Sequence, residues 1–266
     1  MTLKTISSRQ NPIVARYRAA GRGDADHVVL LDGIHLVAEA LNAGVPIRHA
    51  AVKAAAINIT EVGPLVDRLV RSNTDVVVAS APVMDALSPV RSASVIVALA
   101  DRPLPSEPEL YRDAAPLVVI AADVQDPGNV GAIARVAEAG GATGMVAAGA
   151  SASPFGWKAL RGSMGSALRL PILVQPALDR AVEDARHRGC RIVATVPRDG
   201  RPHFEISYAG PVAILIGGEG PGLPPALVER ADDRVTIPMK PPVESLNAAV
   251  TAALLVYEAR RQRASH

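Results

Sequence analysis

A proline-rich segment divides this sequence into two stretches that share the same internal pattern. Residues 101–110 (DRPLPSEPEL) contain three prolines and three acidic residues. Proline lacks a backbone donor and fixes φ, so this composition is typical of a linker. On each side of the segment, short apolar runs alternate with segments of helical periodicity. This alternation predicts two α/β units, because strands that alternate with helices build sheets with helices on their faces.

The expected elements follow from the spacing of apolar residues. Residues 1–105 are predicted to form a small α/β domain, and residues 106–266 a larger domain with a parallel sheet covered on both faces. In the first domain we expect strands at 27–31, 45–52, 75–79 and 94–100 and helices at 34–43, 64–72 and 82–87. In the second we expect strands at 117–122, 144–148, 169–174, 190–196, 212–216 and 233–237 and helices at 130–139, 152–165, 178–188, 224–230 and 245–263.

The chain begins with a strongly basic segment. Residues 1–22 contain no acidic residue, although the formal net charge of the whole chain is only +2. Most of the basic residues are arginines, and arginine suits phosphate better than lysine does, because its planar guanidinium can donate two hydrogen bonds at once. The segment therefore suggests an arm that contacts nucleic acid, but a solvated helix would have the same composition. Its basic residues are Lys4, Arg9, Arg16, Arg18 and Arg22.

Composition argues against several classes of protein. Aromatic residues make up 3% of the chain, too few for the stacking platforms that hold single-stranded nucleic acid. Cys190 is the only cysteine, so a disulfide framework and a cysteine-based zinc site are excluded. The six histidines show no metal-ligand spacing, and we expect no metal. Cys190, beside a predicted strand, is expected to be a small core residue.

No stretch of the sequence predicts a membrane segment or a signal peptide. The longest apolar runs are far shorter than the about 18 residues of a membrane span. The N-terminus (MTLKTISSRQNP) lacks the apolar core of a signal peptide. Together with the single cysteine, these features fit a protein of the reducing cytoplasm.

A polar turn connects the predicted strand 117–122 to the next helix. Its sequence, DVQDPGNVGAIAR (123–135), contains a tight turn at Asp126-Pro127-Gly128-Asn129, and Asn129 is expected to cap the helix. Arg135 follows six residues later in a helix of small apolar residues. Spacing alone favours a capped turn with a surface arginine; a functional arginine is the alternative.

A glycine-rich loop follows the predicted strand 212–216. The loop IGGEGPGL (216–223) has four glycines in six residues, which allows a backbone to approach a ligand closely. It is neither a P-loop nor a dinucleotide-binding fingerprint, since it lacks the lysine of the first and the helix and acid of the second. Glu219 would repel a phosphate, so a cation or a neutral hydroxyl donor is the better ligand.

Two further segments carry polar residues among prolines or small residues. In IPMKPPVESLNAAV (237–250), Ser245 is expected to cap the last helix, and Asn247 to lie in its first turn, where free N–H groups favour anions. An ordinary capped helix would look the same. The segment KALRGSMGSALRLPI (158–172) reads on its own as a basic helix.

In this order and spacing, the segments resemble the SpoU/TrmH family of RNA 2'-O-ribose methyltransferases. The resemblance is carried by DPGNVGAIAR (126–135), LIGGEGPGL (215–223) and IPMKPPVESLNAAV (237–250), with support from residues 158–172. Near the N-terminus, ISSRQNPIV (6–14) and LLDGIHLVAEAL (30–41) resemble the family's small substrate-binding domain. One departure is Gly218, where many relatives have Asn, Ser or Pro; we expect it only to loosen the loop.

The resemblance implies a particular fold and cofactor. The second domain would be a parallel α/β sheet whose C-terminal segment forms a deep trefoil knot of the SPOUT type, an exception to un-knotted topology. The first would be an L30e-like, RNA-binding α/β domain. A homodimer is implied, with its site at the subunit interface and with RNA as partner. The cofactor would be S-adenosylmethionine, held by the backbone around Thr195, Gly217, Gly218, Ile237, Met239 and Leu246.

The resemblance also assigns the catalytic positions. Arg135 matches the family's catalytic arginine, and a permanently charged guanidinium would grip phosphate and stabilise a developing alkoxide. Asn129 would orient Arg135 or the ribose, and Glu219 would hold Asn129 or the loop. Ser245 and Asn247 would fix the cofactor loop and the substrate.

The predicted function is methyl transfer from S-adenosylmethionine to a ribose 2'-hydroxyl of structured RNA. The added N-terminal domain favours 23S ribosomal RNA as substrate. The alternatives are a tRNA 2'-O-methyltransferase and a non-catalytic RNA-binding protein of the same fold. A nicotinamide-dependent oxidoreductase is disfavoured because its fingerprint is absent from the sequence.

Overall fold

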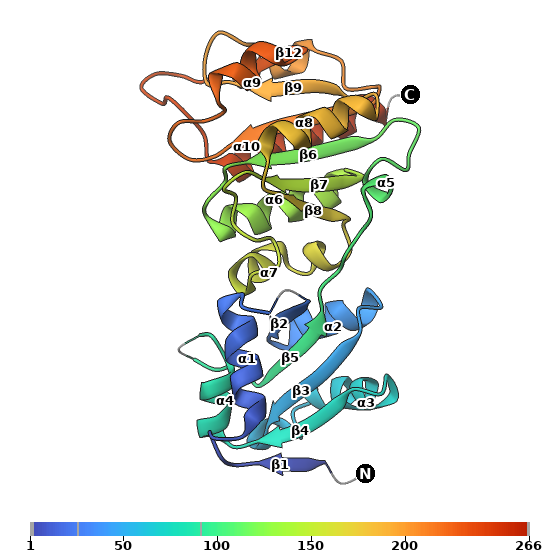
Figure 1. Ribbon diagram of the computed structural model, residues 1–266, viewed down its shortest axis with the longest axis vertical. Coiled ribbons are helices and arrows are strands. Elements are labelled where there is room, and N and C mark those ends of the chain that lie inside the picture. Colours follow the sequence, from blue (N-terminus) through green and yellow to red (C-terminus); the bar gives the residue numbers. More distant parts are fainter. Residues whose placement is uncertain (1–2, 26, 91, 265–266) are drawn as a thin grey trace. The chain divides into compact units, whose positions relative to one another are not determined.

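The structure, a computed structural model, describes residues 3–25, 27–90 and 92–264. The chain divides into two compact units, coloured along the sequence in Figure 1. Unit 1 comprises Met1–Pro103 and Phe155–Arg169, and unit 2 comprises Leu104–Pro154 and Leu170–His266. The first division lies two residues before the predicted one at 105. The linker predicted over 101–110 is partly regular, because it contains a single helical turn, α5 (Glu107–Leu110).

Unit 1 contains a mixed five-stranded sheet in the order β1-β4-β3-β5-β2. Strands β1, β4 and β3 run parallel to one another, whereas β5 pairs antiparallel with both of its neighbours, β3 and β2. The α/β class predicted for this region is confirmed, with a mixed sheet. The strands are β1 (Lys4–Ile6), β2 (Val28–Asp32), β3 (Ile47–Lys53), β4 (Asp75–Ala79) and β5 (Ile96–Asp101).

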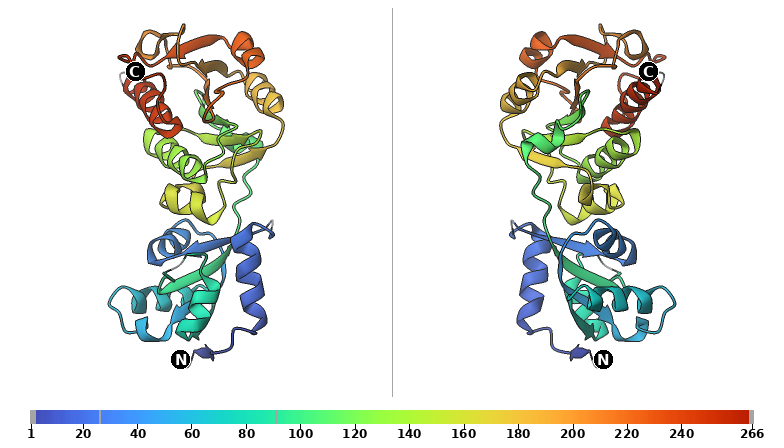
Figure 2. Two further views of the ribbon diagram at one scale, coloured as in Figure 1. Left: turned by 90° about the vertical axis from the view of Figure 1, so that its left-hand side faces the viewer. Right: turned by 90° about the vertical axis from the view of Figure 1, so that its right-hand side faces the viewer.

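Helices cover both faces of this sheet (Figure 2). Helices α1 (Pro12–Arg22) and α4 (Ala81–Leu87) pack together on one face, and α2 (Ile34–Asn42) and α3 (Val62–Arg71) on the other. Each of these helices buries apolar residues at helical spacing. The core is therefore divided between the two faces of the sheet.

The N-terminal segment is folded from residue 4 onward, because β1 and α1 occupy most of it. Of the two interpretations of the basic segment 1–22, the helix is confirmed for Pro12–Arg22, and contact with nucleic acid stays a prediction. Asn11 caps α1 by accepting the N–H of Ile13 at 3.0 Å, and Pro12 occupies the first turn, where its missing donor costs nothing. The helix buries Val14 and Tyr17, and its arginines point away from this apolar face.

Residues 155–169 belong to unit 1, which interrupts the predicted continuous domain 106–266. This segment contains α7 (Trp157–Ser163), shorter than the helix expected over 152–165, and Trp157 packs against the core cluster between the sheet and α1. Arg169 forms an ion pair with Glu39 of α2, and the carbonyl of Met164 lies 3.2 Å from His35 Nε2. These non-local contacts, invisible in the sequence pattern, assign the segment to unit 1.

Unit 2 is built on a seven-stranded sheet in the order β10-β12-β9-β11-β6-β7-β8, in which every pairing is parallel. The predicted parallel α/β fold is therefore confirmed. The strands are β6 (Leu117–Ala122), β7 (Gly144–Ala148), β8 (Ile172–Gln175), β9 (Arg191–Thr195), β10 (Arg201–Pro202), β11 (Val212–Gly217) and β12 (Asp233–Thr236).

Helices cover both faces of the second sheet as well (Figure 2). Helices α6 (Pro127–Gly140) and α10 (Ala248–Arg263) lie side by side on one face, and α8 (Leu178–His187) and α9 (Pro225–Arg230) on the other. All six residues of β6 are buried, as expected of a strand covered on both faces.

The helix pair α6 and α10 packs closely at one glycine. A Cβ on Gly140 would lie 2.1 Å from Val256 Cγ1, so a side chain at this position would separate the helices. This packing leaves the N-terminal ends of both helices beside the loops that follow the strands. Within the described residues, none of the helices has the length and apolar composition needed to cross a membrane.

Candidate active site

The polar segments singled out in the sequence converge at one edge of the parallel sheet. Strands β9, β11 and β6 are neighbours in the order, so the loops at their carboxyl ends leave the sheet side by side. The segment that follows β12, residues 237–247, leads to α10. Ligands of open parallel sheets bind in the crevice outside these carboxyl ends.

A cavity of about 380 Å³ opens among these loops. Its wall combines glycine backbone from residues 217–222 with apolar side chains such as Leu223 and Leu255. Glu219, Ser245 and Asn247 also line it. All six residues predicted to hold the cofactor are lining residues: Thr195, Gly217, Gly218, Ile237, Met239 and Leu246.

Two glycines of the loop, Gly217 and Gly218, have no room for side chains. A Cβ on Gly217 would lie 2.8 Å from the carbonyl carbon of Gly222, and a Cβ on Gly218 would lie 2.0 Å from the carbonyl oxygen of Asp123. The expectation that Gly218 merely loosens the loop is therefore wrong. Here the glycine allows two backbones to touch, and the cavity wall is peptide rather than side chain.

A chain of hydrogen bonds joins three of the predicted polar residues. Asn247 Nδ2 donates to Asn129 Oδ1 at 2.9 Å, and Asn129 Nδ2 donates to Glu219 Oε1 at 2.5 Å. The second carboxylate oxygen of Glu219 accepts the N–H of Gln125 at 3.3 Å. The chain links α10, α6 and the glycine loop, and Asn129 holds two cavity-lining residues at fixed separation.

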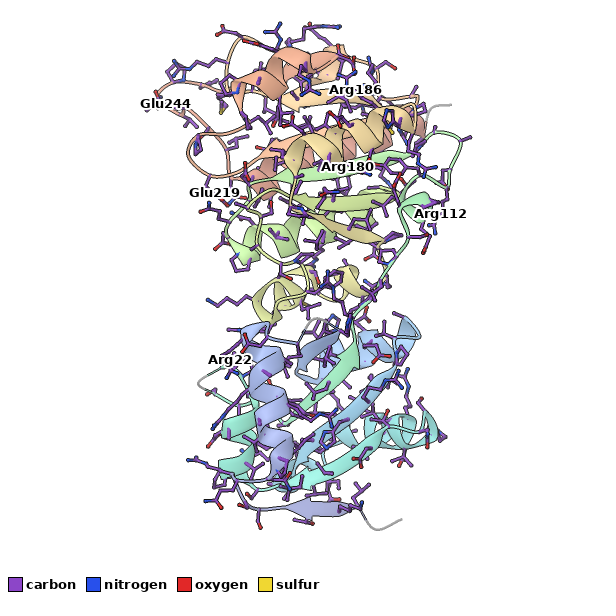
Figure 3. The ribbon with its side chains drawn as sticks, viewed as in Figure 1. Arg22, Arg112, Arg180, Arg186, Glu219 and Glu244 are labelled. Atoms are coloured by element: carbon purple, nitrogen blue, oxygen red, sulfur yellow. The ribbon has the colours of Figure 1, made fainter. Side chains whose placement is uncertain are left out.

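Glu219 ends this chain as a carboxylate. Partial desolvation raises its pKa, but the hydrogen bonds from the Asn129 side chain and from backbone N–H groups, including that of Gln125, lower the pKa below its ordinary value. Glu219 is therefore ionised at neutral pH, and its negative charge favours the orientation in which both asparagine amides donate towards it. Figure 3 shows Glu219 and Glu244 on loops at the same side of unit 2.

Both predicted helix caps are displaced. Asp126, not Asn129, caps α6 by accepting the Asn129 N–H at 2.8 Å, and Pro127 follows in the first turn. Asn247, not Ser245, caps α10: its Oδ1 accepts the N–H groups of residues 249 and 250 at 2.9 and 3.3 Å. Ser245 lies in the preceding loop and lines the cavity. Because Asn247 caps with its oxygen, its amide nitrogen is free to donate to Asn129.

Arg135 is not brought to the cavity of its own chain. It lies six residues beyond Asn129, about 9 Å along the axis of α6. Its side chain is exposed and has no hydrogen bond or ion pair to the part of the chain that the structure describes. Of the two roles predicted for Asn129, orienting Arg135 is not seen within this chain, because the Asn129 side chain bonds to Asn247 and Glu219 instead.

Sequence reasoning missed several residues that shape the site. Asp123 and Gln125 support the glycine loop through the contacts described above. The Asp-Pro pair at 126–127 is itself a signal for a helix start that could have identified the cap. The apolar lining residues carry no signal beyond general hydrophobicity.

The remaining reactive side chains do not form a second centre. Among residues 3–25, 27–90 and 92–264, no group of three His, Cys, Asp or Glu could hold a metal ion. Cys190 is buried in the core, as expected, and desolvation raises the pKa of its thiol to about 11.

Known proteins share this architecture. Residues 116–257 match the SpoU rRNA Methylase family. An uncharacterized tRNA/rRNA methyltransferase of Synechocystis sp. is 32% identical over 98% of this chain and 95% of its own length. The 23S rRNA (guanosine(2553)-2'-O)-methyltransferase RlmP of Bacillus subtilis is 36% identical over 58% of this chain and 61% of its own length.

A solved structure extends the likeness to both units. The crystal structure of an AdoMet-bound rRNA methyltransferase from Sinorhizobium meliloti matches 97% of this chain and 98% of its own, with 27% identity and a TM-score of 0.86. Family match, full-length relative and fold agree with the motifs quoted above. The chain belongs to the SpoU rRNA methylase family.

Proposed function

We propose that this protein transfers a methyl group from S-adenosylmethionine to a ribose 2'-hydroxyl of 23S ribosomal RNA. The observation that carries the proposal is the glycine-walled cavity together with the Asn247–Asn129–Glu219 chain that joins two of its lining residues. Membership of an rRNA methylase family supports the reaction class. The name of the B. subtilis relative supports the ribose 2'-oxygen and 23S rRNA.

The cavity fits S-adenosylmethionine, which supplies an electrophilic methyl group. Its volume of about 380 Å³ lies in the range of small-molecule sites. The backbone walls at 217 and 218, where no Cβ fits, allow close approach of a flat or charged ligand to peptide groups. The residues we propose as its contacts are Thr195, Gly217, Gly218, Ile237, Met239 and Leu246.

The remaining polar residues would orient the ribose and stabilise charge. Arg135 is a permanent cation that can grip a phosphate of the RNA and stabilise the oxygen as its proton departs to phosphate or water. Asn129, held from both sides, presents its amide at a fixed position, and the carboxylate of Glu219 holds that amide. Ser245 and Asn247 would fix the loop over the cavity.

The position of Arg135 favours a homodimer. Arg135 does not line the cavity of its own chain. If the site contains this arginine, a second copy of the chain must supply it. Helix α10 exposes three apolar side chains at helical spacing, Val250 (47% exposed), Leu254 (39%) and Tyr257 (50%). Such a stripe is typical of an interface. We propose that a second copy packs on this stripe and that the Arg135 of each copy completes the site of the other.

Two experiments test the dimer. Leu254→Asp is expected to shift the sedimentation coefficient to that of a monomer and to abolish methyl transfer. Co-expression of Arg135→Ala with Asn247→Ala, each inactive alone, is expected to restore part of the activity, because one site of a mixed dimer would have both functional residues. A monomeric wild-type protein would contradict the dimer.

Unit 1 would bind the RNA substrate. Arg9, Arg18 and Arg22 line a hollow of about 350 Å³ beside α1. Arg9 donates to the carbonyl of Pro82, whereas Arg18 has no hydrogen bond or ion pair to any residue that the structure describes. Figure 3 labels Arg22 on this helix. Arg22 pairs with Asp24 at 2.6 Å, so Arg9 and Arg18 are the arginines of this surface proposed to bind the phosphates of folded RNA.

The resemblance to the family extends the proposal to the chain path and the site of action. We propose that the C-terminal segment forms a deep trefoil knot and that unit 1 is L30e-like. Support for the knot comes from the strand order, in which β9 separates β11 from β12, and from the return of α10 to pack beside α6. As an rRNA-modifying enzyme, the protein would act in the cytoplasm.

The decisive experiment measures methyl transfer from labelled S-adenosylmethionine to 23S rRNA, 16S rRNA and tRNA, followed by mapping of 2'-O-methyl groups in RNA from cells with and without the gene. We expect one lost 2'-O-methyl position in 23S rRNA. Transfer to tRNA instead would favour the alternative substrate. A folded protein that binds RNA but not S-adenosylmethionine would favour a non-catalytic RNA-binding protein.

A further inference from the structure

Asp123 occupies an unusual position at the end of β6. Its φ is +56°, in the left-handed region that side chains other than those of Asn, Asp and His rarely adopt. Its Oδ1 accepts the N–H of Ala150, in the loop after β7, at 2.7 Å. The carboxylate lies close against Gly149, where a Cβ would be 2.3 Å from Oδ1. The side chain is thus anchored to the neighbouring loop in a conformation that needs such an anchor.

The backbone of the same residue contacts the cavity wall. Its carbonyl oxygen lies where a Cβ of Gly218 would come within 2.0 Å, so the two backbones are in direct contact. Gly218 lines the cavity, whereas Asp123 does not. Two residues after Asp123, the N–H of Gln125 donates to Glu219 of the same glycine loop. A change in φ at Asp123 would rotate its carbonyl and displace both contacts.

We propose that Asp123 is a positioning residue for the cofactor cavity. Its carboxylate, anchored on Ala150, maintains the left-handed conformation that seats its carbonyl against Gly218 and thereby holds the glycine loop 217–222 in its binding position. The proposal rests on the proposed function, because it takes S-adenosylmethionine as the ligand of the cavity. It assigns Asp123 no contact with the cofactor or the RNA.

The turn itself has a second restraint, so replacing Asp123 should not unfold it. The hydroxyl of Ser151 accepts the N–H of Val124 at 3.0 Å and lies 2.9 Å from the carbonyl oxygen of Ala121. Three variants separate the two properties of Asp123, namely its side-chain hydrogen-bond acceptor and its tolerance of a positive φ. Asp123→Asn keeps an acceptor and tolerates positive φ; Asp123→Gly keeps only the tolerance; Asp123→Ala keeps neither.

The test measures the Kd of S-adenosylmethionine by titration calorimetry on the full chain. We expect Asp123→Ala to raise the Kd about tenfold, the scale of one lost hydrogen bond to a charged group. Asp123→Gly should be intermediate, and Asp123→Asn should remain within about twofold of wild type. The KM for S-adenosylmethionine should rise more than kcat falls. Gly210→Ala, at a position with open space in the loop that precedes β11, at the opposite end of that strand from the glycine loop, is the matched control.

Hydrogen–deuterium exchange without any ligand gives an independent readout. Asp123→Ala should increase exchange in peptides that cover 149–151 and 217–222, and Asp123→Asn should not. Faster exchange at 149–151 alone, unchanged Kd in Asp123→Ala, or an Asn variant as weak as the Ala variant would each overturn the positioning role. If the wild-type protein binds no S-adenosylmethionine, the proposed function fails, while exchange at 217–222 still decides whether Asp123 positions the loop.

Discussion

The two units are both α/β, but they keep their polar side chains in different places. Of the six buried polar or charged side chains among the described residues, five lie in unit 1, and only Thr143 lies in unit 2. In unit 1 the hydroxyl of Tyr17 lies 2.9 Å from His49 Nδ1 within the core, and buried Asp32 accepts hydrogen bonds from two serines. In unit 2 the polar residues of the candidate site, such as Asn129, Glu219 and Asn247, lie at the carboxyl edge of the sheet.

This difference follows from the sheets. A parallel sheet covered on both faces has strands that are apolar throughout, as in β6, so polar groups with a function must lie where the strands end. The mixed sheet of unit 1 has no single edge of this kind. Its candidate ligand surface is the outer side of α1, where arginines face away from the core. We therefore expect specific geometry to matter in unit 2 and charge to matter in unit 1.

The largest expected effect tests whether catalysis belongs to unit 2. Arg135→Ala should lower methyl transfer by about 10²- to 10³-fold, because it removes the group proposed to stabilise developing charge. The Kd of S-adenosylmethionine should remain unchanged, because Arg135 does not line the cavity. Single-turnover kinetics and calorimetry measure the two quantities.

An arginine in the same unit provides the control for Arg135. Arg180 on α8 pairs with Asp184 at 3.1 Å, and Arg180→Ala should leave transfer at the wild-type rate. Full activity of Arg135→Ala would remove the arginine from the proposed site.

The second prediction tests the importance of geometry at the edge of unit 2. Gly218→Ala forces a Cβ to within 2.0 Å of the Asp123 carbonyl oxygen, so the loop must move. Overpacking of this kind costs about 1–3 kcal/mol. If that cost is expressed in the cavity, the Kd of S-adenosylmethionine rises about 10- to 100-fold. Calorimetry on the apo protein measures it, and an unchanged Kd would mean that the loop can adapt.

The third prediction concerns charge in unit 1. Replacing both Arg9 and Arg18 by Ala should weaken RNA binding several-fold and reduce the dependence of log K on log salt by about one per lost phosphate contact. The affinity for S-adenosylmethionine should not change. Arg71→Ala, on α3 at the other face of the unit, is the control. A weakened affinity with an unchanged salt slope would argue against phosphate contacts on α1.

The sequence predicted the buried strands well but misplaced the caps of two helices. Strands 75–79, 117–122 and 144–148 were predicted with the bounds that the structure has, because each is an apolar run between turn residues. At the starts of α6 and α10, two candidate capping residues stand close together. Pro127 marks Asp126 rather than Asn129 as the cap of α6, whereas local sequence offers no such signal to choose between Ser245 and Asn247. Helix α1 was considered only as a solvated helix, because its arginines obscured four buried positions.

The residues of the site could be predicted from the sequence, but the hydrogen bonds between them could not. Family resemblance identified the residues that line the cavity, yet the hydrogen bond between Asn247 and Asn129 joins positions 118 residues apart. Such a pair is set by the sheet order. The assignment of residues 155–169 to unit 1 is likewise a result of non-local packing. Neither can be derived from periodicity, which reports only the local burial of one face.

The smallest expected effect arises from the buried polar core of unit 1. Burial lowers the pKa of His49 from its ordinary value of 6.5; the carboxylate of Asp75, 4.0 Å from Nε2, acts in the opposite direction, and Arg16 lowers the pKa further. The unfolded chain therefore binds the proton more readily than the folded chain does. The contribution of neutral His49 to stability is complete above pH 6.5 and is lost as the pH falls from 6.5 through the lowered pKa.

Trp157, the only tryptophan of the chain, packs against the core of unit 1, so its fluorescence reports the unfolding of that unit. Between about pH 7.5 and 5.5, the Tm of wild type by this probe should fall by a few degrees. His49→Gln cannot take up the proton and should lose most of this pH dependence, although its Tm at the higher pH is lower. The exposed His27→Gln should behave as wild type. If the Tm of His49→Gln fell as steeply with pH as that of wild type, His49 would not be the source of the pH response of unit 1, and the buried polar core would not set this unit apart from unit 2.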